Sequence, residues 1–252
     1  MISSFFYFTK KLSYYKEKLD LLTAKSIETE IEKIEEKNSN EESEYLTSGE
    51  KRVYNLFTRK LIMISQKIDE SNDSHIFRVG EMSAFLAEKM GKENKFVKDI
   101  KEFAPLHDIG KIFVHSATLN KNDKLTPEEF EEIKKHTSHA TLILDDKYFE
   151  MARNIALYHH EKYDGTGYPF KLKGEEIPIE AQIVSIIDVN DALRSRRIYK
   201  RPVSHEDALS IITKGDGYTK PNHFSPEVLK IFNKHSDEIG MLYYKITKKN
   251  IV

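Results

Sequence analysis

Cysteine is absent from the chain of 252 residues. Disulfide bonds and thiolate-ligated metal sites are therefore excluded, although this absence does not identify a compartment. Charge of one sign is not in excess either, because 40 Lys and Arg residues accompany 41 Asp and Glu residues. Proteins that coat nucleic acid normally carry a clear basic excess, so that class is disfavoured. Any positive charge offered to an anionic ligand must therefore be local.

Long apolar runs are also missing. A membrane-spanning helix needs about 20 consecutive apolar residues, and the apolar start of the chain, residues 1–8, is much shorter than that. This start also lacks the basic-then-apolar order and the small-residue cleavage site of a signal peptide. We therefore expect a cytoplasmic protein without a membrane span.

The chain divides by composition into two regions. Apolar residues recur at helical spacing within residues 12–34, and nine Glu but only two Lys lie between Ser26 and Glu50. Such a composition is typical of a solvated helix end and a linker. We predict a helical N-terminal segment with an acidic linker over residues 1–50, and a larger domain over residues 51–252. A homodimer formed through the N-terminal helices is a further hypothesis.

Helical periodicity dominates the second region, where neither β-alternation of useful length nor a repeat is found. The spacing predicts a helix over residues 52–70, and residues 71–74 offer N-caps for the next helix, which Gly91 is placed to end. The Thr-Pro-Glu-Glu sequence at 126–129 is a capping box that opens a helix continuing to Leu144. A further helix is predicted to open at Ile177 and Pro178. The predicted fold class is all-α.

Two histidine clusters stand out among the ten histidines. His107 and Asp108 are adjacent, as are His159, His160 and Glu161, and both clusters lie in or at the end of apolar helical sequence. Charged or imidazole groups on a semi-buried helix are costly unless they are paired or bind metal. Imidazole and carboxylate donors without thiolate suit Fe, Mn, Zn, Ni or Co. Since neighbouring helical residues point about 100° apart, His107 and Asp108 could contact two metals if Asp108 bridges them.

Three single residues extend this set of candidate ligands. Asp188 lies inside an apolar stretch, His75 precedes an amphipathic helix, and His136 lies in the helix that Thr126 begins. Each has a structural alternative, such as a buried ion pair for Asp188. Together the candidates are enough for a two-metal site: His75, His107, Asp108, His136, His159, His160 and Asp188. The histidines without motif support are expected on the surface or in packing: His115, His139, His205, His223 and His235.

The motifs around these ligands resemble a known family. His-Asp-Ile-Gly-Lys at 107–111 and His-His-Glu-Lys-Tyr-Asp-Gly-Thr-Gly-Tyr-Pro at 159–169 match the two signatures of the HD-GYP family. Further matches follow in order over residues 71–235, including Asp-Val-Asn-Asp-Ala-Leu at 188–193. The resemblance implies a multi-helix HD-domain bundle, with residues 51–252 as an HD-GYP catalytic domain.

The resemblance also implies a ligand set. One metal is expected on His75, His107, Asp108 and Asp188, and a second on His136, His159 and His160, with Asp108 shared. Trinuclear members of the family carry a glutamate four positions before the first histidine, where this chain has Ser71. The expectation is therefore two divalent metal ions, with Fe or Mn favoured.

Other matched positions imply contacts with substrate. Lys111 matches a lysine that reaches the substrate phosphate. A loop with glycines for a tight backbone path is expected to contact substrate through Gly165, Gly167, Tyr168 and Pro169. Arg197 and Lys200 match basic residues on the substrate side, although their basic run could instead be a solvated face.

The implied activity is hydrolysis of cyclic di-GMP to pGpG and/or GMP by a metal-dependent phosphodiesterase, through a metal-bridged hydroxide, with Asp108 and Lys111 as catalytic residues. Two alternatives remain open. A catalytically weak HD-GYP domain would bind a cyclic dinucleotide or a protein and signal. A related phosphohydrolase would act on another cyclic dinucleotide or a nucleoside polyphosphate.

Overall fold

The computed structural model describes residues 48–68, 74–121, 123–195 and 202–249. The chain divides into two compact units, Met1–Lys60 and Leu61–Val252. In the first unit the described part is the start of helix α2 (Ser48–Ile68), where the Thr58 hydroxyl donates a hydrogen bond to the Tyr54 carbonyl. Residues 1–47 lie outside the described part, so the N-terminal segment, its linker and the boundary at residue 50 stay predictions.

The second unit is built from α-helices and short 3-10 helices. In chain order after α2 they are α3 (His75–Lys89), α4 (Asn94–Phe103), η1 (Ala104–Leu106), η2 (Ile109–Phe113), α5 (Ser116–Leu119), α6 (Pro127–Lys134), α7 (His136–His139), η3 (Ala140–Leu142), η4 (Lys147–Phe149), α8 (Glu150–Tyr158), η5 (Gly174–Glu176), α9 (Ile179–Arg194), α10 (His205–Lys214), η6 (Pro221–His223), α11 (Pro226–Lys234) and α12 (Ser236–Lys249). The described ranges contain no β-strand, so the all-α prediction is confirmed. Within these ranges no helix combines the length and apolar character needed to cross a membrane.

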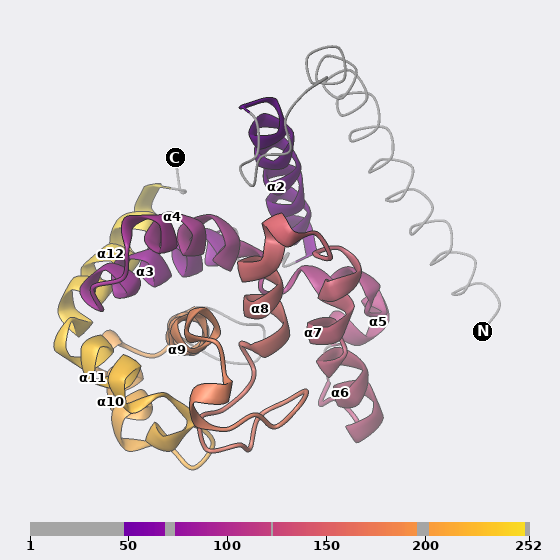
Figure 1. The fold of residues 1–252 in the computed structure, drawn as a ribbon. Coiled ribbons are helices and arrows are strands. Elements are labelled where there is room, and N and C mark those ends of the chain that lie inside the picture. Colours follow the sequence, from indigo (N-terminus) through magenta and orange to yellow (C-terminus); the bar gives the residue numbers. More distant parts are fainter. Residues whose placement is uncertain (1–47, 69–73, 122, 196–201, 250–252) are drawn as a thin grey trace. The chain divides into compact units, whose positions relative to one another are not determined.

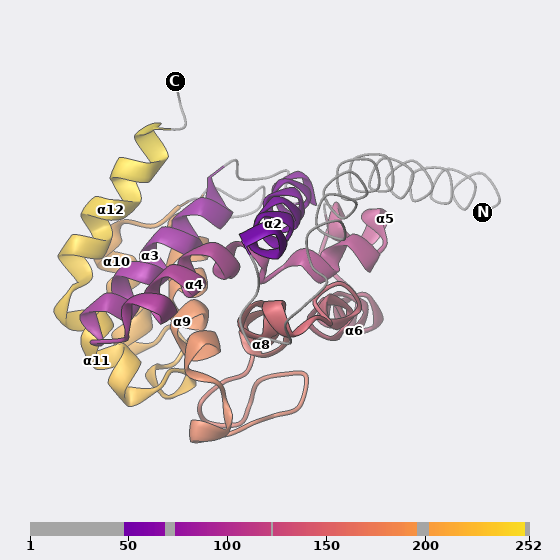
Figure 2. The ribbon, with the colours of Figure 1, turned by 45° about the horizontal axis from the view of Figure 1, so that its top comes forward.

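Helix α9 lies at the centre of the second unit in both views, with α3, α8, α10 and α11 packed against it (Figures 1 and 2). Its sequence explains this position, because the apolar stretch from Ile183 to Ile187 is largely buried. On the facing helix α3, Val79, Met82 and Leu86 have no exposed surface. Their spacing forms the apolar stripe of an amphipathic helix. Burial of these side chains, each contributing about 1.5–3 kcal/mol, stabilises α3 in the core of the second unit.

Local signals placed several helix ends correctly. The Thr126 hydroxyl accepts a hydrogen bond from the Glu129 backbone N–H and the Glu129 carboxylate accepts one from the Thr126 N–H, which confirms the capping box of α6. Gly91 follows the end of α3 with a φ of 72°, a left-handed conformation that suits glycine. Helix α9 begins at Ile179 with Pro178 as its N-cap, close to the predicted opening.

The continuous helix predicted from Thr126 to Leu144 is wrong. Helix α6 ends at Lys134, and α7 and η3 follow as separate short elements. At the break the Lys135 N–H donates to the Glu132 carbonyl, three residues earlier, and η2 packs against the segment that follows. Gly110 allows this approach to the His136 carbonyl, and no residue within α6 predicts it.

Candidate metal centre

Most of the candidate ligands lie at the ends of elements rather than in their middles. His75 is the first residue of α3, His136 is the first residue of α7, and His159 is the C-cap of α8. His160 follows directly, whereas Asp188 lies within α9. Side chains at element ends can converge from separate helices on one point, and these meet beside Asp188 in the interior of α9.

His107 and Asp108 do not lie on a continuous helix, contrary to the sequence-based interpretation. They form the turn between η1 and η2. Pro105 has no N–H to continue the hydrogen bonds of α4, so α4 ends at Phe103 and the chain tightens into η1. The turn still directs the two neighbouring side chains to different partners.

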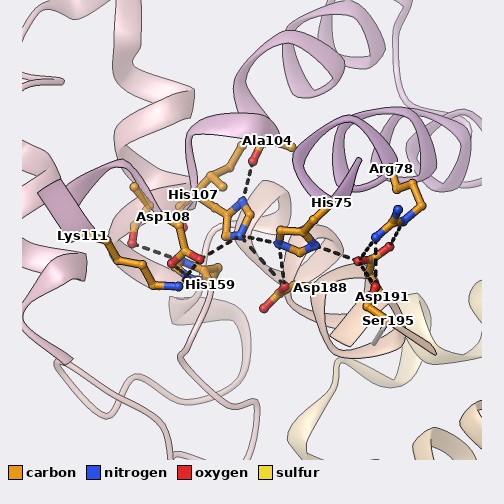
Figure 3. Close-up of polar contacts among 12 residues, drawn as sticks. His75, Arg78, Ala104, His107, Asp108, Lys111, His159, Asp188, Asp191 and Ser195 are labelled. Carbon is orange, nitrogen blue, oxygen red and sulfur yellow. Dashed lines mark hydrogen bonds and ion pairs between the residues drawn. The ribbon is translucent and has the colours of Figure 1, made fainter. Parts of the chain in front are cut away.

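The first cluster gathers around His75 and His107, as Figure 3 shows. Their Nε2 atoms are 3.3 Å apart. Oδ1 of Asp188 lies 3.5 Å from Nε2 of His75 and 3.9 Å from Nε2 of His107. Oδ2 of Asp108 lies 3.4 Å from Nε2 of His107. Ligand atoms of His75, His107 and Asp108 all lie within 4.8 Å of one another, close enough to hold a metal ion.

The second cluster gathers around Oδ1, the other carboxylate oxygen of Asp108. Oδ1 of Asp108 is 3.2 Å from Nε2 of His136 and 3.8 Å from Nε2 of His159. The ring of His160 lies against that of His159, with centroids 3.9 Å apart. Ligand atoms of these four residues also lie within 4.8 Å of one another. Asp108 therefore belongs to both clusters.

The outward ring nitrogens of four histidines are all occupied by oxygen acceptors. Nδ1–H of His107 donates to the Ala104 carbonyl, and Nδ1–H of His136 donates to the Ile133 carbonyl. Nδ1–H of His159 donates to carbonyls of the preceding turn, and Nδ1 of His75 lies 2.7 Å from Oδ2 of Asp191. Such outer partners fix the tautomer and the ring orientation of metal-binding histidines. Each Nε2 atom consequently faces the centre, and any proton on it must be released before a metal binds.

Buried polar atoms without partners test whether a cation fits this centre. Oδ1 of Asp108 and the Nε2 atoms of His136 and His159 are buried and have no hydrogen-bond partner. Leaving a buried polar group unsatisfied costs about 1–3 kcal/mol, and three such atoms face one another here. A divalent cation would coordinate all three at once, and oxygen and imidazole nitrogen are suitable donors for it. The residues therefore fit a metal.

The charges in the centre differ from residue to residue. Burial opposes protonation of His107, but the charge and hydrogen bond of Asp108 outweigh it and raise the pKa of His107 to about 9. Burial and the neighbouring His160 hold the pKa of His159 well below its ordinary value. For Asp108, burial is outweighed by the charges of Lys111 and His107, which keep its pKa well below the usual range. The carboxylate is thus ionised, as metal binding requires.

Lys111 lies on the rim of the centre and is partly buried. Its ammonium group donates a hydrogen bond to Oδ2 of Asp108. Gly110, one residue earlier, allows η2 to approach α7, because a Cβ there would lie 1.9 Å from the His136 carbonyl oxygen. The His-Asp-Ile-Gly-Lys motif therefore combines ligands, a close backbone contact and a cation beside the ligands.

The loop after α8 is fixed by a buried glutamate. Glu161 is 2% exposed, and its carboxylate accepts hydrogen bonds from the backbone N–H groups of residues 170–172. Gly167 has no room for a side chain, since a Cβ would lie 2.5 Å from the Cα of Glu161. The ring of Tyr168, before a cis peptide to Pro169, stacks on the ring of His160 at 4.7 Å. Glu161 thereby places Tyr168 beside the second cluster.

Comparison with known proteins decides the family. A family model described as an HD domain matches residues 70–227. The chain belongs to the HD domain family. Its helical bundle is accordingly an HD-domain bundle, and the clusters around His107 and Asp108 are His/Asp clusters of the kind that holds divalent metals in this family.

Curated relatives of this HD domain are named as phosphodiesterases. The chain is 43% identical over 186 residues to a "Cyclic di-GMP phosphodiesterase" of Thermotoga maritima, covering 73% of this chain and 50% of the relative. It is 35% identical to a "Probable cyclic di-GMP phosphodiesterase" of Vibrio cholerae, covering 68% of this chain and 42% of that protein. It is also 35% identical to a "3'3'-cGAMP-specific phosphodiesterase 2" of Vibrio cholerae, covering 66% and 31%. The chain spans at most half the length of these three relatives.

The structure brings together all seven predicted ligands of the HD domain, but it does not place every predicted residue. Arg197, Lys200 and Ser71 lie outside the described residues. The histidines without motif support do not join either cluster: within the described ranges, His115, His139, His205, His223 and His235 are absent from both. The number of metals and the roles of individual residues stay predictions.

Sequence reasoning missed four residues that support the site. Asp191 contacts the outer nitrogen of His75, Arg78 and Ser195 donate to Asp191, and Glu161 organises the loop. Asp191 follows Asp188 by three positions, and Arg78 follows His75 by three. A spacing of three puts two residues on one helix face, which was the available signal.

Proposed function

We propose that this HD domain is a metal-dependent phosphodiesterase of the HD-GYP type that hydrolyses cyclic di-GMP to pGpG, GMP or both. The observation that carries the proposal is the pair of clusters joined by Asp108, with unpartnered buried donors on both His136 and His159. The names of relatives with 35–43% identity support cyclic di-GMP as the substrate.

In this proposal the site holds two divalent cations, Fe or Mn. The first would be held by His75, His107, Asp108 and Asp188. The second would be held by His136, His159, His160 and Asp108. Two divalent cations held by these residues would activate water and offset the charge of a phosphodiester.

The chain's own residues supply the remaining functions. Lys111 lies beside Asp108 and provides positive charge on the rim, where a phosphate oxygen gains negative charge in the transition state. Tyr168, stacked on His160, lines the substrate side of the second cluster together with the glycines at 165 and 167 and Pro169. Arg197 and Lys200 complete the proposed phosphate contacts. Asp108 and Lys111 are the proposed catalytic residues.

The test is turnover by the purified chain loaded separately with Mn and Fe. Incubation with cyclic di-GMP, followed by chromatography of the products, is expected to yield pGpG or GMP. The double variant His107→Ala, Asp108→Ala is expected to yield neither. Tight binding of the nucleotide without turnover under any metal would instead identify a receptor domain and contradict the proposal.

A second substrate is favoured by a specific observation, namely the identity of 35% to a relative named as specific for 3'3'-cGAMP. The same assay should therefore include 3'3'-cGAMP and a nucleoside polyphosphate. A kcat/KM for either that exceeds the value for cyclic di-GMP would replace the proposed substrate while leaving the chemistry in place.

Two further expectations concern the whole chain. We propose that the protein acts in the cytoplasm and forms a homodimer through its N-terminal helices. Light scattering on the full chain, compared with a chain lacking residues 1–47, tests the dimer. A monomer in both cases would contradict it.

A further inference from the structure

Asp191 is buried at the outer side of the first cluster and contacts no other candidate ligand than His75. It has no exposed surface. Its Oδ2 lies 2.7 Å from Nδ1 of His75, and it also accepts a hydrogen bond from the Ser195 hydroxyl at 3.0 Å. Arg78 donates to both oxygens, from Nε at 2.5 Å and from Nη2 at 2.9 Å. Figure 3 shows this arrangement on the side of His75 away from Asp188.

The carboxylate itself is held in one orientation. Arg78 binds it in a two-point contact, which is geometrically specific. Nη2 of Arg78 also donates to the Ser195 hydroxyl at 2.9 Å, and its guanidinium lies 4.8 Å from the ring centroid of Tyr243. The acceptor for His75 is therefore a carboxylate that is ion-paired with Arg78.

In the second cluster, the outer partners of His136 and His159 are not carboxylates. The outer nitrogens of His136 and His159, like that of His107, meet neutral backbone carbonyls. A carboxylate acceptor raises the basicity of a ligating imidazole more than a carbonyl does, and loss of outer partners typically lowers metal affinity by about 10- to 100-fold. The two clusters thus differ in the charge behind their histidines.

We infer that Asp191 is a positioning residue that selectively strengthens the metal position at His75, with Arg78 holding it in place. This inference rests on the proposed two-metal site. Asp191 acts through His75 alone, so the two positions are inequivalent and the second cluster does not depend on Asp191.

The experiment measures manganese binding without any substrate. Free Mn²⁺ is followed by electron paramagnetic resonance during titration of the metal-free chain, which gives the number and affinity of bound ions. Asp191→Asn is introduced into the wild-type chain, into His136→Ala, which retains the first cluster, and into His75→Ala, which removes the residue through which Asp191 acts. Asp99→Asn makes the same chemical change in the Lys95 ion pair on α4 and serves as the matched control.

In the His136→Ala chain, Asp191→Asn is expected to weaken the remaining Mn²⁺ by about 10- to 100-fold. In the His75→Ala chain it is expected to leave the remaining affinity unchanged, as is Asp99→Asn in every chain. An equal loss of Mn²⁺ affinity in the His136→Ala and His75→Ala chains would show that Asp191 has a general structural role, and it would overturn the inference. So would an unchanged affinity in the His136→Ala chain, or a wild-type chain that binds fewer than two ions.

Removing Asp191 alone leaves the charge of Arg78 buried, which can unfold a protein. The double variant Arg78→Met, Asp191→Asn removes both charges and keeps the test valid. It is expected to fold, judged by circular dichroism, and to show the same loss of Mn²⁺ affinity in the His136→Ala chain. Turnover of cyclic di-GMP by the wild-type chain is assayed separately, so failure of the proposed activity is distinguished from failure of this inference.

Discussion

Gly110 is the residue whose small size matters most for the position of the ligands. A Cβ at this position would lie 1.9 Å from the His136 carbonyl oxygen and 2.7 Å from the Ala140 nitrogen, both of them backbone atoms. We therefore expect Gly110→Ala to lower the free energy of unfolding by about 3 kcal/mol, measured by urea denaturation. Gly174→Ala is the control for a glycine replaced without a clash. The φ of Gly174 is 62°, and a Cβ there would meet nothing within 4 Å. An equal loss in both variants would contradict the proposed clash.

Lys111 offers a second prediction at the scale of a residue. Lys111→Met keeps most of the side-chain volume but removes the charge that lies beside Asp108. We expect kcat for cyclic di-GMP to fall by about 100-fold or more, because charge on the phosphate is no longer offset. Metal content, measured by inductively coupled plasma spectrometry, is expected to stay at the wild-type value. A rise in KM alone, with kcat unchanged, would place Lys111 outside the chemical step.

Among the elements, the loop after α8 depends on one carboxylate. Glu161→Gln replaces an acceptor of three backbone N–H groups by an amide that can satisfy only part of them. We expect a loss of about 2 kcal/mol in the free energy of unfolding and a higher KM for the nucleotide, because Tyr168 is no longer held. The control is Glu175→Gln, which makes the same change in the exposed hydrogen bond to the Tyr163 hydroxyl. A similar loss in both variants would contradict the role given to Glu161.

Helix boundaries were predictable where the deciding contact is local. Thr126 and Glu129 satisfy each other across one turn, and Gly91 ends α3 through its own backbone conformation. The break after Lys134 was not predictable from local sequence, because the contact beside it is with η2, more than 20 residues earlier in the chain. The turn at His107 depends on Pro105, a signal that was present but was outweighed by the apolar residues around it.

For the whole molecule, the residues that form the two clusters were predictable and the residues that support them were not. His107, His159 and Asp188 lie in motifs that could be matched in the sequence. The role of Asp191 and Arg78 depends on a contact between residues 113 positions apart in the sequence. Periodicity within one helix does not specify which residue of another helix it will contact. The N-terminal segment remains a prediction, since residues 1–47 are not described.

Metal removal should affect the whole domain, because the ligands come from α3, the turn before η2, α7, α8 and α9. A cation that binds only the folded chain stabilises it by about 4 kcal/mol when its concentration is 1,000 times Kd. For a domain of this size that corresponds to a rise in Tm of about 10 °C, measured by calorimetry with and without Mn²⁺. The double variant His107→Ala, Asp108→Ala should show no rise. A wild-type Tm that does not change when Mn²⁺ is added would contradict the proposed site.

The outer hydrogen bonds of the histidines also set an order of assembly. The rings of His107, His136 and His159 are oriented by carbonyls three or four residues earlier, so each orientation is available once its own turn has formed. His75 instead finds Asp191 only after 116 residues of chain have been closed into a loop. Contacts of long sequence separation form late in folding because loop closure precedes any gain from them. The orientation of His75 is therefore completed only when α3 and α9 have met, whereas each of the other three rings is oriented within its own turn.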